Sequence, residues 1–101
     1  MARFTTRVEL HDAYGGAYET LHAEIGKRGF TRTIDDGEVN EYQLPIGEYN
    51  LESELTSKQV CDLAVAAAKQ TCTNHDLQEQ PWVLVTKAAD TRQWSGLKKV
   101  Q

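Results

Sequence analysis

The stretch RFTTRVELHDAYGGAYETL, residues 3–21, decides how the fold begins. Over residues 3–10 side chains of opposite character alternate, with Phe4, Thr6, Val8 and Leu10 in one set and Arg3, Thr5, Arg7 and Glu9 in the other. Because successive side chains of a strand point to opposite faces, this alternation predicts a half-buried strand. We expect its polar set on a free sheet face, beside Glu41 and Gln43 of a later strand.

Helical spacing follows this first strand. After a turn from Asp12 to Gly16, larger apolar side chains recur at Tyr18, Leu21 and Ile25. Residues three and four apart share one face of a helix, so the pattern predicts a helix that stops near Gly29.

The middle of the chain is typical of strands. Residues 30–34 predict a second strand, which the turn at residues 35–37 separates from a third at residues 42–46. Residues 49–51 either extend the third strand or open an added one. Residues 82–86 (WVLVT) are continuously apolar, as expected for a strand with both faces covered or in the middle of a sheet.

A second helix lies between these strands. Thr56 and Gln59 have the spacing of a capping box, which marks a helix start. The last stretch, residues 91–100, forms either a short extra strand or a partly ordered tail. The order strand, helix, strand, strand, helix, strand predicts a single α+β domain over residues 1–101 with the ferredoxin-like βαββαβ plan. In that plan two helices pack on one face of an antiparallel sheet whose first and third strands are central.

Composition excludes several classes of protein. The net charge is -4, the mean hydropathy is -0.57, and no apolar run is long enough for a membrane span or a signal peptide, so we expect a cytoplasmic protein. Cys61 and Cys72 on one helix would be about 16 Å apart along its axis, which favours free thiols over a disulfide. No cofactor or metal motif is present in the sequence, so neither is predicted.

Three side chains are candidates for RNA cleavage. His22 on the first helix could remove a 2′-hydroxyl proton while Arg28 stabilises the crowded phosphate. Asp12, at the end of the first strand, could orient a base or bind a divalent ion. The structural alternatives stay open: His22 packs at the core boundary, Asp12 caps the helix or holds the turn, and His11 is solvated.

Arg3, Arg7 and Arg32 form a second candidate set, a basic strip for RNA phosphates. No aromatic side chain is spaced along this strip for base stacking, which argues against a reader of the RNA-recognition-motif type. Trp82 and Trp94 are expected in the core or at its edge.

The runs RFTTRVELHD, GFTRTI and YQLPIGEYNLESELTSKQVCDLA resemble the GhoS family, the small endoribonuclease antitoxins of type V toxin–antitoxin systems. The resemblance covers about residues 3–71. It implies a ferredoxin-like fold similar to CRISPR-associated spacer-acquisition nuclease subunits, and cleavage of a toxin messenger RNA. In those nucleases an aspartate that ends the first strand is functionally placed, and Asp12 matches it. The basic character of the family's first helix is poorly kept in this chain. This departure weakens the expectation of RNA cleavage more than the expectation of the fold.

Two functions of different classes therefore stand side by side. The first is an endoribonuclease antitoxin of bacterial or phage origin that acts on messenger RNA. The second is a non-enzymatic inhibitor from a phage or mobile element, for example an anti-CRISPR, that docks on a basic nucleic-acid-binding partner. Residues 35–62 carry eight acidic and one basic side chain. The docking residues would be Asp35, Asp36, Glu38 and Glu41. A homodimer through free sheet edges is compatible with either function.

Overall fold

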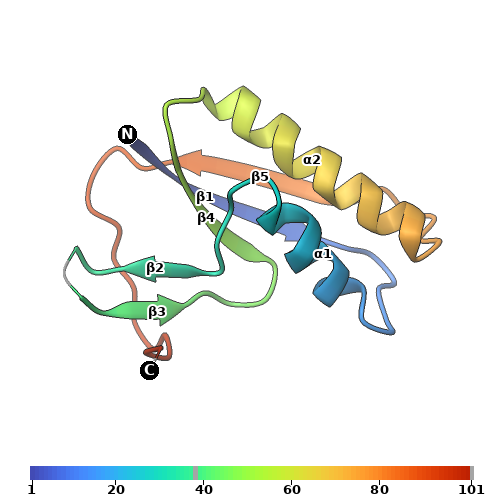
Figure 1. Cartoon of the computed structure of the whole chain (residues 1–101), viewed down its shortest axis with the longest axis horizontal. Coiled ribbons are helices and arrows are strands. Elements are labelled where there is room, and N and C mark those ends of the chain that lie inside the picture. Colours follow the sequence, from blue (N-terminus) through green and yellow to red (C-terminus); the bar gives the residue numbers. More distant parts are fainter. Residues whose placement is uncertain (38, 101) are drawn as a thin grey trace.

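In the computed structural model, which describes residues 1–37 and 39–100, an antiparallel sheet of three strands carries both helices on one face. The strands are β1 (Ala2–Glu9), β4 (Glu48–Ser53) and β5 (Trp82–Lys87), in the order β4-β1-β5. The helices α1 (Ala17–Gly26) and α2 (Ser57–Asn74) pack against each other (Figure 1). The short strands β2 (Thr33–Asp35) and β3 (Glu41–Gln43) form a separate hairpin.

A single backbone bridge joins the chain after α1 to the main sheet. Thr31 and Asn50 donate to each other's carbonyl oxygens, each at 2.8 Å. The segment that follows α1 therefore borders β4, and the spatial order is β5, β1, β4, Thr31. The chain thus has the expected ferredoxin-like α+β plan, with its second strand reduced to one bridge and prolonged by the β2–β3 hairpin.

The core lies between the sheet and the two helices. Phe4 and Val8 of β1 are almost completely buried, and they share one apolar cluster with Leu21 of α1 and Val60 of α2. Burying such a side chain fully contributes about 1.5–3 kcal/mol. A shift of β1 by one residue would turn this whole set outward, so the alternation fixes the strand register.

The two helices start differently. Thr56 Oγ1 accepts from the backbone N–H of Gln59 at 3.1 Å, and Gln59 Oε1 accepts from the backbone N–H of Thr56 at 2.9 Å, so the predicted capping box is confirmed. The residue before α1 is instead Gly16, with φ 84, and no side chain caps this helix. Asp12 therefore does not cap α1; it lies in the preceding turn with φ 54.

Residues 49–51 open an added strand, β4, which is one of the two alternatives the sequence left, because the chain turns between β3 and β4 at Pro45 to Gly47. One strand prediction needs correction. β5 is not covered on both faces. It is an edge strand with α2 on one face only, so Trp82 and Leu84 are 67% and 65% exposed.

The C-terminal segment runs past the hairpin and pairs with it (Figure 1). The backbone N–H of Gln43 donates to the carbonyl of Lys98, and that of Val100 donates to the carbonyl of Glu41, both at 2.8 Å. Residues 98–100 therefore pair with the hairpin like a short strand rather than forming a loose tail. Across the described residues, none of the helices has the length and apolarity needed to cross a membrane.

Candidate functional site

The sheet face opposite the helices carries three rows of side chains. They are Arg3, Thr5, Arg7 and Glu9 of β1, Glu48, Asn50 and Glu52 of β4, and Trp82, Leu84 and Thr86 of β5. The β1 row lies where its alternation predicts. Glu41 and Gln43 do not lie beside it, because they belong to β3 in the separate hairpin. We call this surface the open face.

Charges on the open face are partly balanced. Arg7 lies opposite Glu48 in the strand register, and its Nη2 atom is 3.8 Å from Glu9 Oε1. Arg3 lies opposite Glu52 but makes no ion pair within 4.0 Å in the described part of the chain. The open face is therefore mixed in sign, and the cation at its Arg3 end is not engaged in an ion pair among the described residues.

A second arginine reinforces that end. Arg92 Nη1 donates to Asn50 Oδ1 at 2.8 Å and to Thr5 Oγ1 at 3.1 Å, which fixes the guanidinium against the sheet. Burial and the neighbouring charge of Arg3 lower the pKa of Arg92, while Glu52 and Asp35 act in the opposite direction. Arg92 also has no ion pair within 4.0 Å among the described residues, although the Glu52 and Asp35 carboxylates are near enough to act on its pKa.

A pocket of about 380 Å³ opens beside these two arginines. Its walls come from the start of β1, the tip of the β2–β3 hairpin and the segment at residues 91–94. Trp94 lines the pocket, with its ring centroid 5.4 Å from that of Tyr42. Asp35 and Asp36 also line it, and the Asp35 carboxylate accepts from the backbone N–H of Gly37 at 2.8 Å.

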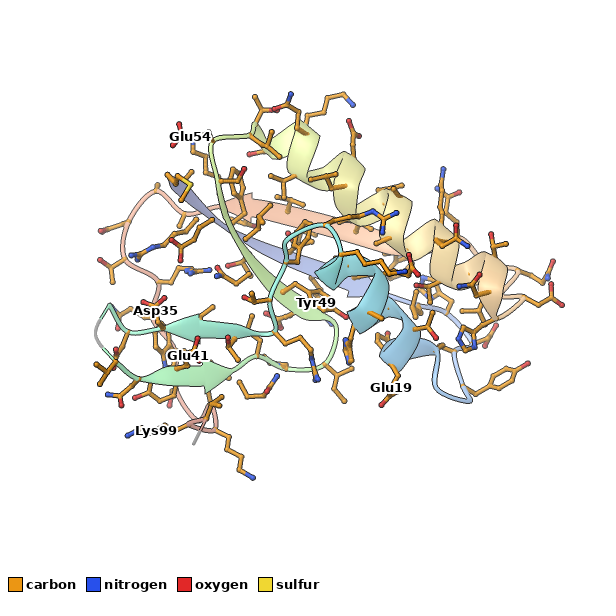
Figure 2. The ribbon with its side chains drawn as sticks, viewed as in Figure 1. Glu19, Asp35, Glu41, Tyr49, Glu54 and Lys99 are labelled. Carbon is orange, nitrogen blue, oxygen red and sulfur yellow. The ribbon has the colours of Figure 1, made fainter. Side chains whose placement is uncertain are left out.

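Three of the four acidic residues predicted to dock on a basic partner lie in the described part of the chain. Asp35 and Glu41 are directly opposite in the β2–β3 register and lie together on the hairpin (Figure 2). Together with Glu52 they line a groove of about 250 Å³. Asp36 accepts from the Asn40 side-chain amide at 3.1 Å. Glu38 lies outside the described residues. Docking of this hairpin on a basic partner stays a prediction.

The other end of the open face is apolar. Trp82 and Leu84 extend from the edge strand β5, and with Arg7 and Glu9 they line a shallow pocket of about 260 Å³. The His11 ring packs edge-on against Trp82, with centroids 4.4 Å apart and planes at 74°. His11 is therefore not solvated as expected: its side chain is 20% exposed, and its Nε2 atom is buried without a partner among the described residues.

A polar cluster lies on the helix side of the sheet, where Tyr49 of β4 faces α1 (Figure 2). His22 Nδ1 is 2.7 Å from the hydroxyl of the fully buried Tyr49. Burial and then the charge of Arg32 lower the pKa of His22, with Glu19 opposing them. Burial raises the pKa of Tyr49, so this hydrogen bond joins two uncharged groups near neutral pH.

The predicted catalytic residues do not come together. Asp12 is exposed in the turn before α1, and Arg28 Nη1 donates to the backbone carbonyl of Glu24 at 2.7 Å. Among the described residues no hydrogen bond or ion pair joins Asp12, His22 and Arg28. Their catalytic roles stay predictions.

The predicted basic strip is divided between two faces. Arg3 and Arg7 lie on the open face, whereas the charge of Arg32 acts on His22 and Tyr49 on the helix side. The backbone bridge at Thr31 explains the separation, because Arg32 is the next residue and points away from the Thr31 side chain.

Sequence reasoning missed two residues of the open face. Trp82 was expected in or near the core, yet it stands beside the β1 row, opposite Glu9, and supplies the aromatic surface that the row itself lacks. Arg92 lies in a stretch without periodicity. The position of Trp82 at the start of an apolar run, directly after Pro81, was the available sequence signal for its exposure. No local sequence signal marks Arg92.

Comparison of the chain with protein-family models, with curated proteins and with solved structures gives no match. The resemblance to the GhoS family therefore remains a prediction. In residues 1–37 and 39–100 no group of three His, Cys, Asp or Glu side chains is placed to hold a metal ion.

Proposed function

We propose that this protein binds single-stranded RNA on the open face of its sheet. The observation that carries the proposal is the pair Arg3 and Arg92, two adjacent cations without a carboxylate partner in the described chain, on the same face as the exposed ring of Trp82. Arginines recognise phosphate oxygens, and exposed aromatic rings stack on unpaired bases.

The dimensions of the face suit a short segment of RNA. Arg3 and Glu9 are six residues apart on β1, which is about 20 Å along a strand, and Trp82 lies opposite Glu9. A phosphate at the Arg3 end would relieve the repulsion between the two guanidinium groups. A base at the other end would cover apolar surface on Trp82 and Leu84.

The acidic neighbours limit how strongly this face attracts nucleic acid. Glu48, Glu52 and Glu9 lie next to the arginines, so we count at most three phosphate contacts, at Arg3, Arg7 and Arg92. For a single strand this number predicts a slope of log affinity against log salt of about -2. Binding is thus expected to be moderate and only modestly salt-dependent.

Cleavage of the bound RNA, and with it an antitoxin role in the cytoplasm, is the further step implied by the GhoS resemblance. The observation that favours it is the His22 imidazole, which is held uncharged beside Arg32 and is therefore able to accept a proton. His22 lies on the helix side, so RNA would have to pass around β4 to reach it from the open face.

The test is fluorescence anisotropy with a labelled oligoribonucleotide at about 50 and about 200 mM salt. Losing one stacking ring costs about 1–3 kcal/mol, so Trp82→Ala should weaken binding about 5- to 150-fold. Tyr14→Ala is the matched control, because Tyr14 is 77% exposed but lies in the turn before α1. Equal affinities of the two variants would overturn the proposal. The same samples, run on a denaturing gel beside His22→Gln, show whether the RNA is cut and whether His22 is needed.

A further inference from the structure

We propose that the pocket between Arg3, Arg92 and Asp35 binds a guanosine monophosphate unit. The site shares Arg3 and Arg92 with the open face and so rests in part on the proposed function, but it is also lined by the hairpin tip and residues 91–94 and does not include Trp82. Its volume of about 380 Å³ is within the range of pockets that hold small molecules.

The arginine wall selects an anion. Arg92 is held in place through Nη1 by Thr5 and by Asn50, a residue that is only 7% exposed. One guanidinium nitrogen is thus used for positioning, while Arg92 and Arg3 both line the cavity. Two adjacent guanidinium groups without an ion pair in the described chain match a phosphate, which accepts several charge-assisted hydrogen bonds.

Asp35, which lines the same pocket, offers a carboxylate to the ligand. Asp35 Oδ1 accepts from the backbone N–H of Gly37, which orients the carboxylate, and among the described residues its second oxygen has no hydrogen-bond partner. A carboxylate in this position repels a second phosphate and accepts N–H groups. Among the RNA bases only guanine presents two adjacent donors, N1–H and N2–H, to a single carboxylate.

An aromatic ring completes the pocket. Trp94 lines the cavity and is half-buried, and its contact with Tyr42 restrains the ring. A purine is the larger stacking partner for an indole. The three features together suit a ligand that has a phosphate, a planar base that can meet the indole, and paired N–H donors.

Calorimetric titration of the full chain with guanosine monophosphate, adenosine monophosphate, guanosine and inorganic phosphate tests this site. A bidentate contact with the correct base is expected to favour the guanine nucleotide over the adenine nucleotide roughly 10-fold. Asp35→Asn should abolish this preference while adenosine monophosphate binding persists. The substituted side chain keeps an amide oxygen that can still accept from the backbone N–H of Gly37, so the hairpin tip retains this contact.

Arg3→Gln should weaken both nucleotides alike, whereas Lys58→Gln, which removes an equal charge from the exposed surface of α2, should leave both affinities unchanged. Equal binding of the two nucleotides, no binding at millimolar concentration, or a guanine preference that survives in Asp35→Asn would each overturn the proposal. A short RNA ending in a guanosine 3′-phosphate, compared with the same RNA ending in a hydroxyl, distinguishes an RNA terminus from a free nucleotide. Trp82→Ala separates this site from the open face, since it lowers RNA affinity only if the proposed function holds.

Discussion

Replacing Gly47 by alanine tests how β4 is held against β1. Gly47 has φ 89, and a Cβ atom there would lie 2.7 Å from the backbone carbonyl oxygen of Val8. The left-handed conformation costs an alanine about 1–2 kcal/mol. Relief of the clash would disturb the hydrogen bond of 2.7 Å from the Val8 N–H to the Gly47 carbonyl, at a further cost of about 0.5–1.5 kcal/mol. We therefore expect a loss of about 1.5–3.5 kcal/mol, roughly a 6–28 °C fall in melting temperature.

Gly96→Ala is the matched control for this prediction. Gly96 has φ 79, but no heavy atom lies within 4 Å of the position its Cβ would take, so only the conformational cost applies. Urea denaturation followed by circular dichroism gives the free energy of unfolding of both variants. Equal losses in the two would refute the argument from close approach, because they would leave backbone conformation as the whole effect.

Two further predictions concern pH and capping. Burial and Arg32 lower the pKa of His22 below its ordinary value of 6.5, so the unfolded chain binds more protons in this range. The stability contribution of neutral His22 is full above about pH 6.5 and is lost as pH falls toward the folded-state pKa. His22→Gln should therefore flatten this part of the plot of unfolding free energy against pH. An unchanged plot would contradict the lowered pKa. Thr56→Ala should destabilise the fold by about 1 kcal/mol through loss of the capping box, while Ser57→Ala should have little effect. Chemical denaturation measures the free energy of unfolding of both variants. Equal losses would count against a stabilising role of the capping box.

Local patterns were enough to predict most of the elements. The β1 alternation and the Thr56 capping box depend on neighbours within a few residues, and both are present in the structure. The apolar run at β5 was misread because a central strand and an edge strand can share that composition. Which one forms depends on whether another strand lies outside β5, and in the described chain none does.

The candidate site was harder to predict than the fold. Arg3 and Arg7 follow from strand periodicity, but Arg92 reaches Thr5 across 87 positions and Asn50 across 42. His22 and Tyr49 likewise meet across 27 positions. Such contacts are determined by how the elements pack, and the residues next to either partner in the sequence do not predict them.

The attachment of the C-terminal segment sets one wall of the pocket apart from the main apolar core. Residues 91–94 line one wall of the pocket, and residues 98–100 pair with β3 of the hairpin rather than with β1, β4 or β5. Substitutions that reshape this wall therefore remove little buried apolar area from the main cluster. Evolution can therefore vary the lining of this pocket at the hairpin and at residues 91–94 while the packed scaffold beneath it is inherited unaltered.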